Sequence, residues 1–334
     1  MTFYERLKKI NIQQAFFTFM LLFVVVLFSL LNPKFLSIAN GINIARQMAE
    51  MMILAVSMTF VLISGGVDLS IAKTGVMAGC LAGVILVNLA GKMPEGLAVT
   101  IAILCSLGAG GVIGMINGLL ISKLRVLPFI ATLGSMTVAY GIAMLLTGGK
   151  TISKLPESFT KMGTGYFLRG TFENVKGVQG IPVSALIMVS IVIVSAFVIK
   201  KTDFGLNIYA IGGNYKAARL AGLDNDKILL LVYSISGVLS ALAGLILTAR
   251  YISAQPGLWA GANLEVIAGC VIGGTSMRGG SGSVVSSLLG MLLMTCMSTG
   301  LNLAGINYSW QQVATGALVI AAVSLDMLSK NKEI

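Results

Sequence analysis

Side chains that could do chemistry are scarce in the apolar parts of this 334-residue chain. Four carboxylates lie inside or beside apolar segments: Glu50, Asp68, Glu265 and Asp326. No two of them have the spacing of a catalytic acid and base pair. The chain has no histidine, and its cysteines lie singly in apolar segments, at Cys80, Cys105, Cys270 and Cys296. We therefore expect small core cysteines and neither an enzyme nor a metal site.

Most of these carboxylates have a structural interpretation. Glu50 follows Arg46 by four residues, the spacing of an ion pair on one helix. Glu265 lies where a short helix would begin, so it either stabilises that helix end or serves an external opening. Gly149 and Lys150 resemble the end of a nucleotide-binding loop, but Met144 replaces the glycine that such a loop needs. We expect no cofactor on this chain.

Asp68 is the unusual carboxylate, because it lies in "ISGGVDLSIA", residues 63–72, between two apolar runs. In one interpretation, Gly65 and Gly66 end a helix, and Asp68 or Ser70 caps the amides of the next one. In the other, Asp68 binds a coupling ion between half-helices, as in a secondary transporter or channel.

A second glycine-rich break is "IGGTSMRGGSGSV", residues 272–284, which contains Gly273, Gly274 and Arg278. Irregular backbone at membrane depth is tolerated only where protein or water covers it. Both breaks are therefore expected to be buried in the fold or to face a pathway.

The composition indicates a membrane protein, since 56% of residues are hydrophobic, 10% are charged and the mean hydropathy is +0.93. We interpret the chain as one all-α, polytopic domain, residues 1–334, with broken or re-entrant glycine-rich turns. Ten spans are predicted, at about 15–31, 46–64, 71–90, 97–121, 126–147, 181–199, 228–249, 264–275, 283–303 and 306–327. The first run lacks a cleavage site and is expected to be a retained helix rather than a signal peptide.

Basic residues are scattered among short loops, although the net charge is +11. This distribution sets orientation in a membrane and does not favour nucleic acid. It predicts cytoplasmic termini, with residues 1–14 inside, residues 150–180 forming a structured external loop, and residues 200–227 forming the longest cytoplasmic loop.

Many of the 40 glycines have the spacing of helix contacts. Five of them lie four residues apart in two groups: Gly79 and Gly83, then Gly110, Gly114 and Gly118. Such faces let backbones approach closely in lipid, although a pore lining would use the same surfaces.

The loop at 200–227 contains "NYKAARLAGL", which predicts a short amphipathic helix. Asn214 would start the helix and Gly222 would end it. Ala217, Leu220 and Ala221 would share one face, with Lys216 and Arg219 on the other. A partner's groove or lipid headgroups could receive this helix.

Several blocks of sequence, in order, carry a family resemblance. They are "IYAIGGNYKAARLAGLDNDKILLLVYSISGVLSALAGLI", "SAQPG", "IAGCVIGGTSMRGGSGSV" and "GLNLAGINYSWQQVATGALVIAAVSLD". The chain resembles the permease subunit of ribose- and xylose-type ATP-binding-cassette importers from about residue 33 to 327, and "SGGVDLSIA" is similar to that family's "SGIDLSVG". Lys73 is a departure, since the family usually has small residues there.

The resemblance implies a bacterial inner-membrane permease that translocates a monosaccharide and leaves ATP and Mg to a separate ATPase. It implies three protein partners: a second permease, the cytoplasmic ATPase and an external sugar-binding protein. Asn214 to Gly222 would be the coupling helix, with Ala217, Ala218 and Gly222 matching part of the importer signature. The signature's downstream Leu-Pro is missing here.

Overall fold

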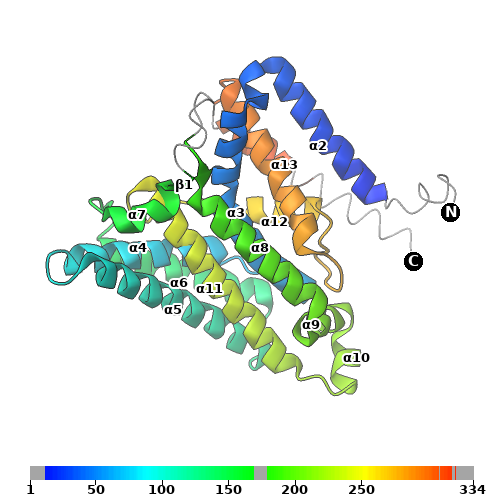
Figure 1. The fold of residues 1–334 in the computed structure, drawn as a ribbon. Helices are drawn as coiled ribbons and strands as arrows, with labels where there is room; N and C mark the ends of the chain where they lie inside the picture. The colour runs from blue at the N-terminus through cyan, green and yellow to red at the C-terminus, as the bar shows by residue number, and fades with distance from the viewer. Residues whose placement is uncertain (1–11, 169–178, 308, 318–319, 321–334) are drawn as a thin grey trace.

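A computed structural model describes residues 12–168, 179–307, 309–317 and 320. Within these residues the chain is almost entirely helical (Figure 1). The elements are α2 Ile12–Leu31, η1 Pro33–Leu36, α3 Ile38–Ile63, α4 Ile71–Leu89, α5 Glu95–Ser122, α6 Pro128–Thr147, α7 Glu157–Thr164, β1 Tyr166–Phe167, β2 Ile181–Pro182, α8 Val183–Lys201, α9 Asp203–Gly213, α10 Tyr215–Leu220, α11 Asn225–Tyr251, α12 Ala262–Ile272 and α13 Val284–Leu303.

Seven helices in the described part are long and apolar enough to cross a membrane, and two shorter apolar segments, Phe19–Leu31 and Ala262–Ile272, accompany them. These nine coincide with the first nine predicted spans, which confirms an all-α polytopic membrane protein. Of the tenth predicted span, residues 309–317 are helical, and most of the remainder, with Asp326, lies outside the described residues.

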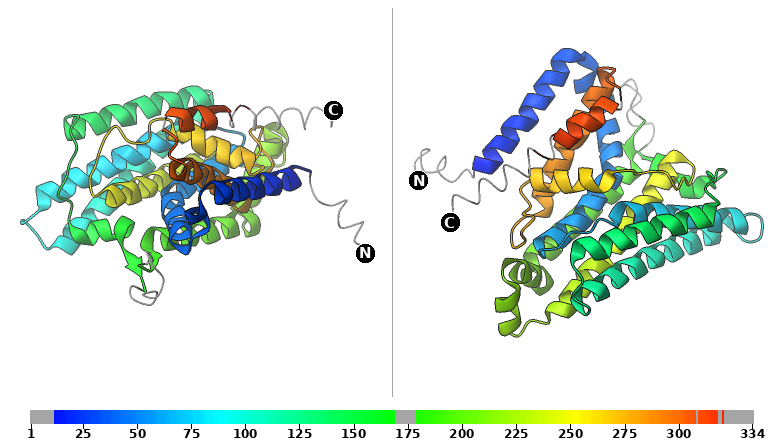
Figure 2. Two further views of the ribbon diagram at one scale, coloured as in Figure 1. Left: turned by 90° about the horizontal axis from the view of Figure 1, so that it is seen from above. Right: turned by 180° about the vertical axis from the view of Figure 1, so that it is seen from behind.

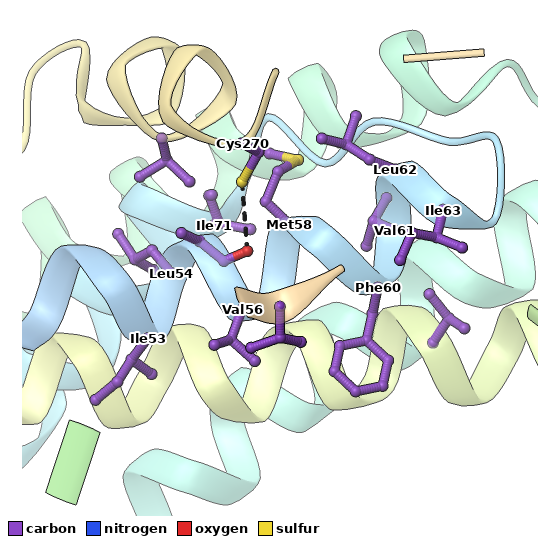
Figure 3. Close-up of a cluster of buried hydrophobic side chains, with 14 of the residues drawn as sticks. Ile53, Leu54, Val56, Met58, Phe60, Val61, Leu62, Ile63, Ile71 and Cys270 are labelled. Carbon is purple, nitrogen blue, oxygen red and sulfur yellow. Dashed lines mark hydrogen bonds between the residues drawn. The ribbon is translucent and has the colours of Figure 1, made fainter. Parts of the chain in front are cut away.

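The helix α3 is the centre of the core, because its second half is buried on nearly every side. Figure 3 shows apolar side chains of this helix, between Ile53 and Ile63, packed with Ile71 of α4 and Cys270 of α12. The Cys270 thiol donates a hydrogen bond to the Ala55 carbonyl oxygen at 3.5 Å, drawn dashed in Figure 3. Cys270 is thus a small core residue, as predicted for all four cysteines. Cys80 and Cys296 are also buried, but the prediction is wrong for Cys105, which is exposed.

The helix α11 packs along α4 and α5 through glycines, and this is the packing that the sequence predicts. A Cβ atom at Gly114 would lie 2.2 Å from the Tyr233 carbonyl oxygen, and one at Gly110 would lie 2.5 Å from that of Gly237. Gly118 approaches Leu230 of α11 in the same way. Figure 2, seen from behind, shows α4, α5 and α6 lying side by side.

On α4, Gly79 contacts Thr248 and Gly244 of α11, while Gly83 contacts Ala254 just beyond that helix. All five predicted packing glycines therefore lie at close contacts between segments. Close approach of this kind is how small residues pack helices together in a membrane.

The two ends of the bundle carry different short elements (Figure 1). At one end, α7 and the antiparallel pair β1–β2 form the structured loop predicted for 150–180, apart from residues 169–178, which lie outside the described part. At the other end lie α9 and α10. The prediction of a long loop with one short helix at 200–227 is incomplete, because α9 fills residues 203–213.

The predicted pair of Glu50 with Arg46 is wrong. Glu50 is 1% exposed and forms an ion pair with Arg250 of α11, with 2.6 Å between Oε1 and Nη2. Arg46 instead donates a hydrogen bond to the Tyr166 hydroxyl at 3.3 Å. The pair therefore links α3 to α11 inside the fold.

Candidate functional site

The predicted short helix exists as α10, and its ends are those expected. The Asn214 side chain accepts a hydrogen bond from the Ala217 amide at 3.0 Å and caps the helix. Gly222 has a φ of +88°, the left-handed conformation that ends a helix without strain in glycine.

The apolar face of α10 points away from the protein. Ala217 and Ala221 are exposed, and Leu220 is 89% exposed, whereas Ala218 is buried against the bundle. Lys216 and Arg219 are also exposed. The surface is therefore available to another molecule and is not used in the chain's own core.

An ionic cluster anchors α10 to its neighbours. The Arg125 guanidinium, in the loop between α5 and α6, pairs with Asp226 of α11 at 3.0 Å and donates a hydrogen bond to the Tyr215 hydroxyl. Asn225 donates to the Tyr215 carbonyl oxygen at 2.8 Å. The hydrogen bond to Tyr215, together with Asp226, raises the pKa of Arg125, so this side chain stays charged. The cluster fixes the position of α10 relative to α5 and α11.

A cavity of about 340 Å³ lies between α10, the α5–α6 loop and the first glycine-rich break. Its lining includes Gly65, Gly66, Arg125, Arg219 and Tyr233. The first break therefore lies at the α10 end of the bundle.

Five glycines bring three chain segments together at this end, and we call them the glycine junction: Gly65, Gly212, Gly213, Gly279 and Gly280. The Gly280 amide donates a hydrogen bond to the Ile63 carbonyl oxygen at 2.9 Å, which joins the two breaks. A Cβ atom at Gly212 would lie 1.8 Å from the Ile63 oxygen. The chain that leads into α10 thus packs backbone to backbone on both breaks.

Asp68 is buried and accepts hydrogen bonds on both carboxylate oxygens. One oxygen accepts from the Ser70 amide at 2.9 Å and from the Ser70 hydroxyl at 2.6 Å. The other accepts from Ser236 of α11 at 2.8 Å, and Ser236 contacts Ser57 of α3 at 3.0 Å. Asn117 of α5 donates to the Ser70 hydroxyl at 3.0 Å. Asp68 therefore joins α3, α5 and α11 to the start of α4.

The capping prediction for this stretch is correct only in part. Gly65 has the left-handed φ of +84°, but Gly66 does not; a Cβ there would meet the Tyr233 hydroxyl at 2.3 Å. Ser70 is the N-cap residue of α4 by position, yet its side chain makes no capping hydrogen bond. Its hydroxyl is used instead in the Asp68 network.

The second break is also held in place by polar contacts with neighbouring helices. Ser287 of α13 accepts a hydrogen bond from Thr59 of α3 at 2.7 Å and contacts Thr275 at 3.1 Å. Tyr209 of α9 donates to the Gly282 carbonyl oxygen at 2.7 Å. Burial raises the pKa of Tyr209, so its hydroxyl keeps the proton that it donates. These bonds tie the second break to α3 and α9.

The other residues predicted for this break, Gly273, Gly274 and Arg278, contact different segments of the chain. A Cβ at Gly273 would lie 2.1 Å from the Ser286 carbonyl oxygen of α13, and Gly274 has a φ of +102°. The backbone oxygen of Arg278 lies next to Gly65. Both breaks therefore gather at the α10 end, whereas the packing glycines Gly79 to Gly118 lie along α11. Prediction from sequence missed Gly212, although the repeated Gly-Gly pairs were a signal.

Comparison with known proteins places the chain among transport permeases. Residues 40–323 match a family model described as branched-chain amino acid transport system / permease component. The ribose import permease protein RbsC of Bacillus subtilis (strain 168) is 40% identical over 95% of this chain and 94% of its own length. RbsC of Escherichia coli (strain K12) is 35% identical over 92% and 91%.

The galactose/methyl galactoside import permease protein MglC of Escherichia coli (strain K12) is 37% identical over 92% of each chain. No solved structure was found to match. The similarity spans α3 to α13, and thus both breaks and α10.

Proposed function

The chain belongs to the family of transport-system permease components, and from this membership we propose that it is the membrane-spanning subunit of an ATP-driven importer of a monosaccharide. The observation that carries the proposal is the alignment, over more than nine-tenths of both chains, with permeases named for ribose and galactose import. The family description names branched-chain amino acids, so the cargo class follows from these relatives and not from the family alone.

In this proposal the chain breaks no covalent bond, and ATP and Mg are bound by a separate cytoplasmic ATPase. An external binding protein delivers the sugar, and a second permease subunit completes the pathway. The multi-pass chain lies in the bacterial inner membrane with both termini in the cytoplasm. This orientation places α10 on the cytoplasmic side and α7 with β1–β2 on the outer side, at opposite ends of the bundle (Figure 1).

The helix α10 is the coupling helix that the ATPase receives. Its outward face has one large apolar side chain, Leu220, among small and basic residues. A helix that rests on lipid headgroups needs a broader apolar face. The compact face of α10 suits a protein groove better.

The glycine junction connects α10 mechanically to the membrane-spanning helices. Gly212 packs on both breaks, so a displacement of α10 would be passed at once to the end of α3 and to the loop between α12 and α13. This is rigid-body motion of packed elements, with the chemistry done in the ATPase.

The alternative function, an ion-coupled transporter that uses Asp68, is not supported by the relatives, which are import permeases. The contacts of Asp68 agree with this. Its oxygens accept hydrogen bonds from Ser70 and Ser236 and serve to hold four segments together.

The test is uptake in proteoliposomes that contain the permease together with its proposed ATPase and binding-protein partners. We expect ATP-dependent uptake of labelled ribose or galactose, and none with an ATPase that binds but cannot hydrolyse ATP. Labelled leucine is the control for the family description. Uptake of leucine instead of either sugar would refute the cargo class. Sugar uptake that follows an ion gradient without ATP would refute the importer itself.

A further inference from the structure

Lys73, on the first turn of α4, is a lysine inside the apolar bundle. Its Nζ atom donates a hydrogen bond to the Leu258 carbonyl oxygen at 2.9 Å and lies 5.0 Å from the centre of the Tyr140 ring. Among the residues that the structure describes, no carboxylate forms an ion pair with it. Within the described part of the chain, its charge is therefore balanced by a backbone dipole and an aromatic face.

The first break begins at the α10 end of the bundle with Gly65, but the contacts around Lys73, eight residues further on, place this side chain well inside the bundle. Gly75, two residues on, packs against the Ser240 carbonyl oxygen and the Gly244 amide, near the middle of α11. Tyr140 is near the middle of α6. A lysine at an end of a span can extend to the headgroups, but one at half depth cannot, and charges there are usually functional.

The chain beside Lys73 is not helical. After α11 ends, residues 252–261 run along α4, with Ala254 against Gly83 and Trp259 against Gly75. Those glycines are eight positions apart on α4, so the segment descends by about 12 Å before α12 begins. Irregular backbone at this depth must be covered by protein or must line water.

This part of the structure is only partly covered. Lys73 and Trp259 are half-buried, Gly261 is exposed, and Tyr140 is 39% exposed. An ammonium group facing lipid here would be costly, whereas one facing water would not. Together these contacts point to a wet surface formed by α4, α6 and residues 252–261.

We infer that Lys73 lines a water-filled part of the translocation pathway at half depth and gives it a positive potential. The site favours cargo with a carboxylate or phosphate group, such as an acidic sugar, over cationic cargo such as an amino sugar. The inference rests on the proposed import function, but its test needs neither cargo nor ATPase partner.

The test measures how charge affects the labelling of a cysteine beside Lys73. The purified permease, freed of its four native cysteines by substitution with serine or alanine, carries Tyr140→Cys. Two methanethiosulfonates that differ in charge, an anionic sulfonatoethyl and a cationic trimethylammonioethyl reagent, label it in separate reactions. The ratio of anionic to cationic rates is divided by the same ratio for a small thiol in solution.

We expect this normalised ratio to exceed one for Tyr140→Cys and to fall by about 5- to 15-fold when Lys73→Gln is added. This is the effect of one unit charge that acts in water, at about 5 Å, on two reagents of opposite charge. The conservative Lys73→Arg keeps the charge and is expected to keep the ratio. Val138→Cys lies on the same helix and is 55% exposed, but on another face, and it controls for access from lipid.

Two results would overturn the inference. One is the absence of labelling at Tyr140→Cys by either reagent in protein that is folded by size-exclusion chromatography, because the site would then be dry. The other is a normalised ratio of one or less with Lys73 in place. The second result can be obtained even if Lys73→Gln does not fold. Because this experiment does not measure uptake, either result would overturn the inference about Lys73 without affecting the proposed import function.

Discussion

Gly212→Ala tests whether the glycine junction connects α10 to the membrane helices. The added Cβ atom would lie 1.8 Å from the Ile63 carbonyl oxygen and 2.6 Å from the Gly280 amide nitrogen. Both neighbours are backbone, so neither can move aside as a flexible side chain would. At least one of the three segments must shift.

The cost follows from two losses. Overpacking of a close contact costs about 1–3 kcal/mol. The hydrogen bond from the Gly280 amide to the Ile63 oxygen, 2.9 Å long, adds about 1 kcal/mol if the shift breaks it. We expect Gly212→Ala to reduce stability by about 2–4 kcal/mol, enough to lower the apparent melting temperature by several degrees and still leave folded protein.

The neighbouring glycine provides the control. A Cβ atom at Gly213 would meet nothing within 4 Å, although it follows Gly212 at the same helix end. Gly213→Ala is therefore expected to melt like the parent protein. The comparison separates the effect of the contact from that of replacing a glycine in α9.

The assay has two measurements, the melting temperature of the purified permease and its ATP-driven sugar uptake with the ATPase bound. For Gly212→Ala we expect a lower melting temperature, retained ATPase binding, since α10 itself is unchanged, and fewer sugars imported per ATP. If Gly212→Ala melts and transports like Gly213→Ala, the backbone contacts do not join α10 to the breaks, and the reasoning fails.

Three further tests follow from the contacts of Asp68, Gly114 and Leu220. Asp68→Asn can still accept hydrogen bonds from Ser70 and is expected to keep most of the stability, whereas Asp68→Leu leaves buried donors unpaired and costs about 3–5 kcal/mol. Both effects are measured as the yield of monodisperse protein. Loss of uptake in stable Asp68→Asn would contradict a purely structural role for the carboxylate. Gly114→Ala places a Cβ atom 2.2 Å from the backbone of α11 and is expected to destabilise the protein by about 1–3 kcal/mol. The control is Gly108→Ala on the same helix, where the added Cβ atom meets nothing within 4 Å. Equal melting temperatures for the two variants would refute the packing of α5 on α11. Leu220→Glu on exposed α10 should leave melting unchanged and weaken co-purification of the ATPase at least tenfold, and unchanged co-purification would exclude this face as the docking surface.

The membrane spans could be predicted from the sequence because a run of about 20 apolar residues has few alternatives in a chain of this composition. The helix α10 could be predicted because Asn214 and Gly222 mark its ends locally. The helix α9 could not, because Gly205 and the pair at 212–213 disfavour an isolated helix. The structure stabilises it through the Thr202 cap and the burial of one side that includes Ile208.

The partners of the carboxylates were beyond local pattern. The spacing of Glu50 favours Arg46, yet the pair forms with Arg250, which is distant in sequence and brought near by the packing of α3 on α11. For Asp68, the sequence indicates a cap, whereas Ser236 of α11 supplies a further hydrogen bond. Spacing along the sequence predicts hydrogen bonds and ion pairs between residues close in sequence. It does not predict partners that are distant in sequence and brought together by packing.

The contacts of the first break argue that it is a fixed joint and not a hinge. On one side, Asp68 and Ser70 hold it by hydrogen bonds to α5 and α11. On the other side, Gly65 packs on Gly212 and Gly279 with no side chain between them. A hinge needs backbone angles that are free to change, and neither side leaves that freedom. The end of α3 and the start of α4 are therefore expected to move with α9 and α10 as one body. Relative motion must then occur between this body and the helices outside it.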